Sequence, residues 1–208
     1  LSGTELYRWT IHTPDGGDAL ASNRMQLRTD GQLGDAIDGL IVCAGFDPLA
    51  AKRPALLGQV RRLWRAGCQV GAIDTGAFIL AEAGILGRET ITLHWEAAEE
   101  FRRRYPRIPV STELYERHAR LFTCAGGTAA MDMMLDAIAH SHGLALATAV
   151  SDQLIHDAIR PASAPQRAPL AEQASHAGPV VQRLIAAMER QLGQGGGIEA
   201  ILQGEGIS

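Results

Sequence analysis

Residues 70–84 have the sequence Val-Gly-Ala-Ile-Asp-Thr-Gly-Ala-Phe-Ile-Leu-Ala-Glu-Ala-Gly. The pattern predicts a buried strand at 69–73 and a helix at about 76–83 that Gly84 terminates. Ala72 and Gly76, two positions to either side of Asp74, are small, as a sharp strand-to-helix turn requires, because its backbone packs tightly against its neighbours. We therefore predict a nucleophile-elbow turn with Asp74 at its apex, facing the crevice at the carboxyl ends of the strands.

Strand and helix patterns alternate outward from this turn. The predicted elements in chain order are a strand at 7–11, a strand at 40–44, a helix at 53–66, the strand and helix of the turn, a helix at 96–105, and a strand pair at 110–115 and 121–124. Gly126 and Gly127 then precede a long helix that runs through Met131 to Ile138, and a further helix covers about 144–156. The apolar run at 40–44 is typical of a strand covered on both faces. The order favours an α/β fold with a doubly wound, mostly parallel sheet and helices on both faces.

The composition changes at Arg160. Three prolines, Pro161, Pro165 and Pro169, punctuate an Ala/Ser/Gln-rich stretch and predict a linker at 161–176. An apolar stripe then predicts a helix at 177–194, and three glycines at 195–197 begin an expected tail that runs to residue 208. We therefore expect one α/β domain at 1–160, a linker and a C-terminal helical appendage.

Bulk composition excludes several classes of protein. A formal net charge of −4 gives this chain no electrostatic reason to bind DNA, whose partners carry excess Lys and Arg. The three cysteines have neither zinc-site nor disulfide-framework spacing, and no apolar run reaches the roughly 20 residues that cross a bilayer. We expect a cytoplasmic protein without membrane contact, metal or cofactor, and the sequence has no Gly-x-Gly-x-x-Gly nucleotide motif.

The turn and its surroundings resemble a known family. The pattern Ala72-x-Asp74-Thr75-Gly76-Ala77-Phe78-x-Leu80-Ala81-x-Ala83-Gly84-x-Leu86, with Thr92-x-His94-Trp95, is similar to the ThiJ/PfpI branch of the class I glutamine amidotransferase-like superfamily. More narrowly, it resembles the sensor half of AraC-type transcription regulators. Supporting matches are 122–129, Phe-Thr-Cys-Ala-Gly-Gly-Thr-Ala, and 153–160 with His156, Asp157, Ile159 and Arg160.

The resemblance implies a flavodoxin-like fold, a ligand-sensing role and a homodimer. The helix at 180–192 resembles the opening of an AraC-type helix-turn-helix region, so DNA contact is expected only through a C-terminal part absent here. The family's first strand and helix, which would precede Tyr7, are also expected to be missing. In the enzymes of the branch the elbow residue is a cysteine and a histidine follows, and these positions correspond to Asp74 and His94. Because a carboxylate is a poor acyl-transfer nucleophile beside a thiolate, we expect no thiol-type catalysis.

The predicted site is a metabolite pocket at the elbow. Its expected residues are Gly45, Phe46, Asp74, Thr75, His94, Trp95, Gly126 and Gly127. An acidic apex on the crevice floor suits a cationic group of the ligand, such as an amino, guanidinium or quaternary ammonium group. Simpler readings remain open: Asp74 as a helix N-cap, and Trp95 as core packing.

Two other functions remain open at this level. Asp74 with His94 as its base would make a hydrolase that forms an ester intermediate, although the sequence offers no clear acid to orient His94. Alternatively, the chain is a dimerisation module whose pocket is vestigial.

Overall fold

Four strands form the central sheet in the order β3-β4-β6-β5 in the computed structural model, which describes residues 1–21, 23–51, 54–167, 178–191 and 198–206. The first three are parallel, and β5 is antiparallel to β6. Their bounds are β3 Gly39–Ala44, β4 Gln69–Asp74, β5 Tyr115–Arg117 and β6 Leu121–Cys124. A separate two-stranded sheet pairs β1, Ala19–Leu20, with β2, Gln26–Leu27.

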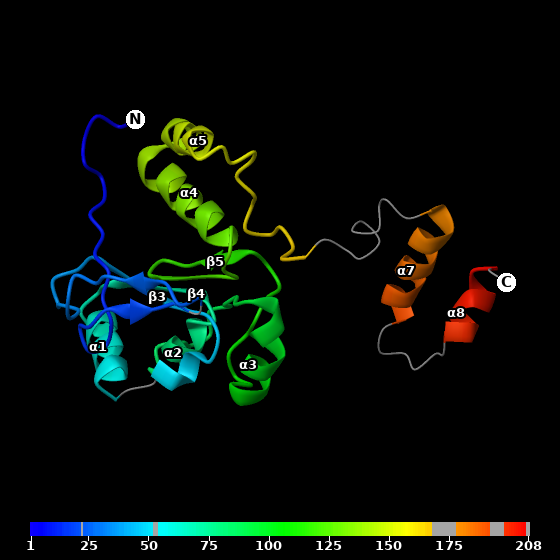
Figure 1. Ribbon diagram of the computed structural model, residues 1–208, viewed down its shortest axis with the longest axis horizontal. Coiled ribbons are helices and arrows are strands. Elements are labelled where there is room, and N and C mark those ends of the chain that lie inside the picture. Colours follow the sequence, from blue (N-terminus) through cyan, green and yellow to red (C-terminus); the bar gives the residue numbers. More distant parts are fainter. Residues whose placement is uncertain (22, 52–53, 168–177, 192–197, 207–208) are drawn as a thin grey trace. The chain divides into compact units, whose positions relative to one another are not determined.

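Helices cover both faces of the central sheet. Three of them, α1, α2 and α3, lie on one face, and α4 and α5 lie on the other (Figure 1). Their bounds are α1 Pro54–Arg65, α2 Ala77–Glu82, α3 Ala98–Arg104, α4 Ala129–His142 and α5 Leu144–Gln153, with short 3-10 helices η1 at Pro48–Ala51 and η2 at Trp95–Ala97. The predicted α/β fold with its mostly parallel sheet is confirmed.

Three strand predictions are wrong in whole or in part. Residues 7–11 belong to no strand, and the side chain of Trp9 is 81% exposed. Among the described residues, Ile11 exchanges hydrogen bonds with Asp30 alone, which is too little pairing to form a strand. Strand β3 is an edge strand whose residues alternate between exposed and half-buried, so it is not covered on both faces. Of the predicted strand at 110–115, only Tyr115 lies in β5, whereas Val110 forms an isolated bridge with Ile91.

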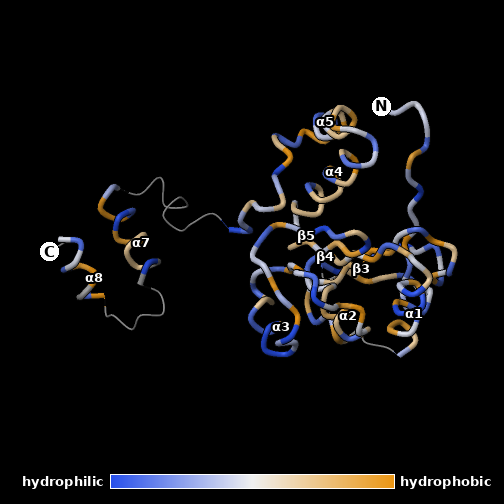
Figure 2. Tube along the Cα trace, turned by 180° about the vertical axis from the view of Figure 1, so that it is seen from behind, coloured by the Kyte–Doolittle hydropathy of each residue, from blue (hydrophilic) through white to orange (hydrophobic). Residues whose placement is uncertain are grey.

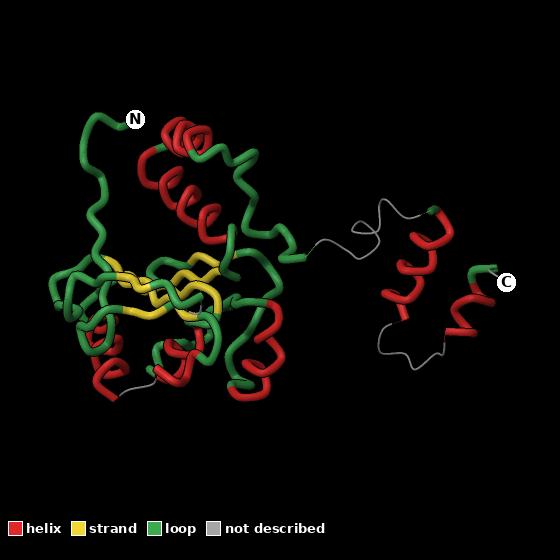
Figure 3. The backbone as a smooth tube through the Cα atoms, viewed as in Figure 1, coloured by secondary structure: helices red, strands yellow, loops and turns green. Residues whose placement is uncertain are grey.

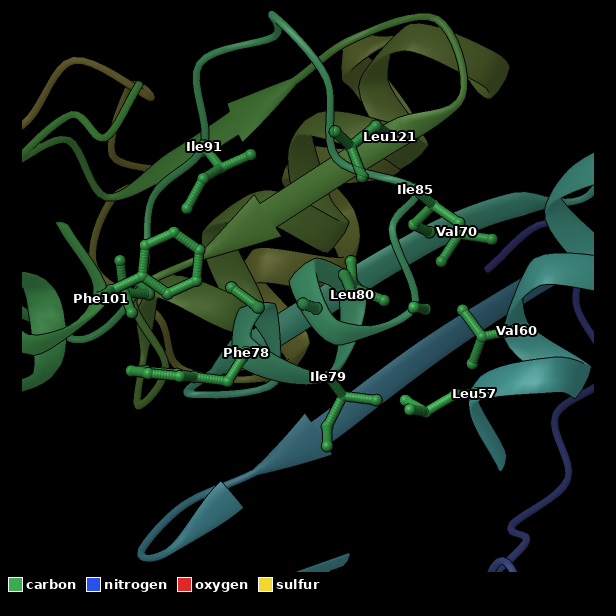
Figure 4. Packing of buried hydrophobic residues seen from close by; sticks show 14 of the residues in the cluster. Leu57, Val60, Val70, Phe78, Ile79, Leu80, Ile85, Ile91, Phe101 and Leu121 are labelled. Carbon is green, nitrogen blue, oxygen red and sulfur yellow. The ribbon is translucent and has the colours of Figure 1, made fainter. Parts of the chain in front are cut away.

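The largest apolar cluster lies between the sheet and the helices that flank the elbow. Phe78 of α2 contacts Phe101 of α3 edge-on, with ring centroids 5.0 Å apart, and both side chains are buried (Figure 4). Helix α1 adds Leu57 and Val60 to the same cluster. The strands β3 and β4 form one of the more hydrophobic parts of the trace (Figure 2). This packing fixes α2, and with it the turn that precedes α2.

The chain divides into two compact units, Leu1–Gln166 and Arg167–Ser208. The second unit contains α7, Pro179–Gln191, and α8, Ile198–Gly204, which pack through the buried residues Ala187 and Ile201. Residues 198–204 were expected in a tail and instead form this second helix. Most of the predicted linker, 168–176, lies outside the described residues. Among the described helices, none combines the length and apolar character needed to cross a bilayer.

Candidate functional site

Asp74 is the last residue of β4 and stands at the apex of a sharp turn into α2. Its φ angle is +60°, a left-handed conformation that non-glycine residues seldom adopt and that Asp tolerates better than most. The two amides that follow close the turn: Thr75 N–H donates to Ala44 O at 3.1 Å and Gly76 N–H to Ile73 O at 3.1 Å. The predicted elbow geometry is therefore present at the predicted residue.

Small residues permit the turn. A methyl group on Gly76 would lie 2.2 Å from the carbonyl oxygen of Val42, and one on Gly126 would lie 2.8 Å from Cβ of Asp74. Ala72, on the other side of the apex, is almost fully buried. Neither glycine position has room for a larger residue, because the neighbouring atoms belong to backbone or to Asp74 itself.

The reading of Asp74 as a helix cap is wrong. The N-cap of α2 is Gly76, and no described side chain forms a capping hydrogen bond there. The carboxylate of Asp74 is therefore not used to satisfy the start of the helix, and it lines a cavity instead.

That cavity has a volume of about 430 Å³. Four carboxylates line it: Asp47, Asp74, Glu96 and Glu100. Among the described lining residues none is Lys or Arg, and His94 is the one side chain that can carry a positive charge. The arrangement makes the cavity strongly negative. It favours a positively charged group, because opposite charges attract more strongly where water is partly excluded.

His94 is positioned by its own loop. It caps η2, where its Nδ1 accepts a hydrogen bond of 3.4 Å from the amide of Glu96. The Glu96 carboxylate lies 3.8 Å from the same nitrogen, and the ring of Trp95 lies 5.6 Å away, centroid to centroid. If the imidazole is neutral, its proton is on Nε2, because Nδ1 is an acceptor. His94 is then a hydrogen-bond donor at Nε2, and its lone pair is on Nδ1, which already accepts from the Glu96 amide.

Burial raises the pKa of Asp74 above its usual value. The charge of His94 and the amide of Thr75 lower the pKa of this carboxyl, and the negative charge of Glu96 raises it further. A carboxylate whose ionised form is penalised in the empty cavity gains most from a cationic partner, because that partner relieves the penalty.

The structure brings together five of the eight predicted pocket residues. Gly45, Phe46, Asp74, Thr75 and His94 line the cavity. Trp95 contacts it only through His94, and Gly126 packs behind Asp74. Gly127, the eighth, does not line the cavity.

Several residues that line the cavity were not predicted from the sequence. They are Asp47, Pro48, Leu49, Phe78, Glu96, Ala97 and Glu100. Glu96 and Glu100 are four residues apart, directly after His94, and this helical spacing was the available signal that both reach the same side.

The cysteines are poorly suited to catalysis. Cys124 is fully buried, and burial raises its pKa to about 11, while burial also raises the pKa of Cys43. Raised pKa values leave both thiols protonated near neutral pH, and a thiolate is the reactive form. Neither residue lines the cavity.

Comparisons with known proteins give transcriptional regulators as sequence relatives. The chain is 45% identical over 188 residues to the HTH-type transcriptional regulator CdhR of Pseudomonas aeruginosa, an alignment that covers 89% of this chain and 56% of that protein. The chain thus spans a little over half the length of that relative. The curated relatives on which the assignment rests are transcriptional regulators rather than enzymes. No protein-family model matches the chain.

Two solved structures have a fold similar to that of this chain. A crystal structure of an AraC family transcriptional regulator from Pseudomonas putida matches with a TM-score of 0.66 and 24% identity, over 72% of this chain and 82% of that one. A ThiJ/PfpI family protein from Pseudomonas syringae matches with a TM-score of 0.62 and 17% identity, over 92% and 77%. Sequence and fold together identify the chain: it belongs to the AraC-type transcriptional regulators, as their N-terminal domain with the DJ-1/ThiJ/PfpI fold.

Proposed function

We propose that this chain is a non-catalytic sensor whose cavity at Asp74 binds a small cationic metabolite. The bound state passes to the DNA-binding part of the regulator, which lies C-terminal to the described elements. The supporting observation is the cavity itself, with four carboxylates and, among its described lining, neither Lys nor Arg. An anionic ligand would be repelled by these carboxylates.

The elbow supports binding rather than acyl transfer. The residue at the apex is Asp74, and the amide that follows it, which serves as an oxyanion donor in hydrolase elbows, already donates to Ala44 O. The lone pair of neutral His94 is on Nδ1, where it already accepts a hydrogen bond from the amide of Glu96. Glu96 lies near enough to orient His94, and it is the one feature that favours the rival hydrolase.

A substrate assay separates the two functions. We expect no turnover of amides, peptides or methylglyoxal by the purified chain, before or after thiol alkylation. Turnover that alkylation abolishes would assign catalysis to a cysteine and contradict the proposal. Turnover that survives alkylation but is lost in Asp74→Asn would support the carboxylate hydrolase.

A ligand screen tests the binding proposal. Amino acids, polyamines and betaines are added to the chain, and the rise in Tm is measured, because a ligand that binds the native state raises it. Each cation is paired with a neutral compound of the same shape, such as choline with 3,3-dimethyl-1-butanol. We expect cations to raise the Tm and their neutral partners to have little effect. Stabilisation by neutral or anionic compounds alone would contradict the proposal.

We further propose that the regulator acts as a homodimer. Transmission of a bound state requires the ligand to favour one arrangement of domains or subunits over another, and two-fold assembly supplies such arrangements. Sedimentation of the chain across a concentration series tests this point. A plain dimerisation module with a vestigial cavity would dimerise and bind none of the screened cations.

A further inference from the structure

The last stretch of the first unit, residues 160–166, is held against the body of that unit, and we call it the exit strap. The main-chain amide of Leu114 donates to Ala162 O at 3.0 Å and to Ala164 O at 3.1 Å. Pro165 forms an isolated antiparallel bridge with Glu113. The strap follows α5 as a loop that runs back toward the sheet (Figure 3). Although its prolines resemble those of a linker, its hydrogen bonds make it part of the domain.

Gln166 fastens the end of the strap, immediately before the second unit begins. Its Nε2 donates to three oxygens: Thr92 Oγ1 at 3.0 Å, Leu93 O at 3.1 Å and Glu113 O at 3.0 Å. The hydroxyl of Thr92 donates in turn to Glu113 O at 2.8 Å. The other side-chain atom, Oε1, is buried and has no partner among the described residues. Gln166 therefore holds the end of the strap through the N–H groups of its side-chain amide alone; we call these contacts, and those of Arg160 described next, the two clamps of the strap.

Arg160 fastens the start of the strap. Its guanidinium donates to Asp132 Oδ2 from Nε at 2.8 Å and from Nη2 at 2.6 Å, and Nη2 also donates to Thr128 Oγ1 at 2.7 Å. Its main-chain amide donates to Asp132 Oδ1 at 2.9 Å, and His156 Nε2 lies 2.8 Å from the same oxygen. Asp132 is fully buried, so this end of the strap is tied to the first turns of α4.

Gln166 binds the residue that precedes a cavity-lining one, and Arg160 binds the loop that packs behind the elbow. Leu93, whose carbonyl accepts from Gln166, directly precedes His94. The hydroxyl of Thr128 accepts a hydrogen bond from Arg160, and Thr128 comes directly after Gly126 and Gly127. Gly126 packs against Asp74. Gln166 is therefore linked to His94 through Leu93, and Arg160 is linked to Asp74 through the loop 126–128.

We propose that the exit strap couples the cavity to the unit that follows it, with Gln166 positioning the main chain before His94 and Arg160 positioning the loop behind Asp74. The inference rests on the proposed sensing function, because only a cavity that responds to a ligand has a state to transmit. A cation held between Asp74 and His94 restrains the segments on which both clamps close. It thereby fixes where the chain leaves the domain at Gln166, and by linkage a looser strap weakens binding in the cavity.

The test uses Gln166→Met in the 208-residue chain, which keeps the length of the side chain and removes its donors. Amide hydrogen exchange and the ring signals of His94 are followed by NMR. We expect the Leu114 amide, which donates to the strap, to exchange at least about tenfold faster, because three hydrogen bonds are lost. We also expect the His94 ring signals to shift. The Val60 amide, in the buried core of α1, should accelerate less than the Leu114 amide, because local opening of α1 does not release the strap. Gln153→Met, an exposed glutamine of α5, is the matched control and should alter none of these signals.

Three outcomes would overturn the inference. An unchanged Leu114 amide would mean that Gln166 does not hold the strap. A faster Leu114 amide with unmoved His94 signals would mean that the strap does not reach the cavity. Equal acceleration at Val60 would make Gln166 an ordinary structural contact. This experiment uses no ligand, so its result does not depend on the outcome of the metabolite screen. In the same way, a failure of this experiment would not change the outcome of the screen.

Discussion

Asp74 combines a strained backbone with a carboxylate that burial penalises. Its φ of +60° costs an L-residue about 1–2 kcal/mol unless the side chain is Gly, Asn or Asp. The raised pKa means that the folded state binds a proton at this residue more tightly than the unfolded state does. The penalty of ionisation is therefore absent at low pH and develops as pH rises from the ordinary Asp value of about 3.9 through the raised one.

Substitutions at Asp74 separate these two effects. At pH 7 we expect Asp74→Asn to be more stable than the parent by about 0.5–2 kcal/mol, because the ionisation penalty is gone while the left-handed conformation is tolerated. Asp74→Ala should be less stable than Asp74→Asn by about 1–2 kcal/mol. Urea unfolding from pH 4 to 8 measures both differences. The advantage of Asn should shrink toward pH 4, and a constant advantage would rule out the ionisation penalty as its cause.

At the scale of the element, the elbow depends on the absence of a side chain at Gly76. We expect Gly76→Ala to destabilise the chain by about 1–3 kcal/mol or more, because its methyl group would meet the carbonyl of Val42 at 2.2 Å. Gly58 in α1 has open space around it, so Gly58→Ala should stabilise the helix by about 0.5–1 kcal/mol. Thermal unfolding of the two variants measures the contrast. Similar changes in both would show that the turn relaxes around the added methyl group.

Helix α4 contains a buried carboxylate and a surface one, four residues apart. Hydrogen bonds from His156 and Arg160 outweigh the effect of burial, which alone would raise the pKa of Asp132, and they hold it below its usual value. Asp132→Asn should cost about 3 kcal/mol, because it weakens a buried ion pair and leaves Arg160 poorly compensated. Asp136 pairs with Arg117 at 2.9 Å on the surface, and Asp136→Asn should cost about 0–1 kcal/mol.

The pH dependence of the Asp132 effect follows from the sign of its shift. A lowered pKa stabilises the fold above about pH 4, and this stabilisation is lost as pH falls through the folded-state value. The difference between parent and Asp132→Asn should therefore be full at pH 7 and smaller at pH 3. A difference that grows on acidification would contradict the assignment.

Local patterns in the sequence predicted the elements that depend on local packing. The turn at Asp74 was predictable because its strand, its small flanking residues and its helix are contiguous in the chain. The behaviour of residues 7–11 was not predictable, because alternation in Tyr7, Trp9 and Ile11 indicates which side chains share a face but not which strand they would pair with. No described strand pairs with this stretch. The same limit applies to β3, whose apolar run gave no sign of its place at the edge of the sheet.

The candidate site was predictable where it follows strand ends and hidden where it depends on a loop. Asp74 and Gly45 follow adjacent parallel strands, so their convergence follows from topology. Glu96 and Glu100 enter the cavity only because η2 and α3 turn toward it after His94. The role of Gln166 was equally hidden, since its contacts lie 53 to 74 residues away in the sequence.

At the scale of the whole molecule, DNA recognition should require the part of the regulator beyond this chain. With a net charge of −4, residues 1–208 should show no sequence-specific binding in a fluorescence-anisotropy titration with promoter DNA. The full-length regulator should bind, and its affinity should fall as salt rises, because binding releases counterions from the phosphates. Tight, sequence-selective DNA binding by residues 1–208 would contradict the assignment of DNA recognition to another part of the regulator.

Charge recognition by Asp74 is central to the proposed function, and one titration measures it directly. A cation that raises the Tm of the parent is titrated by calorimetry into the parent, Asp74→Asn and Glu99→Gln, an exposed carboxylate of α3 outside the cavity. Asp74→Asn should weaken binding about ten- to a hundredfold, the loss expected for a charge-assisted contact of about 1.5–3 kcal/mol, and Glu99→Gln should bind as the parent does. Equal affinity in the parent and Asp74→Asn would contradict the account and place the recognition of the ligand elsewhere in the cavity.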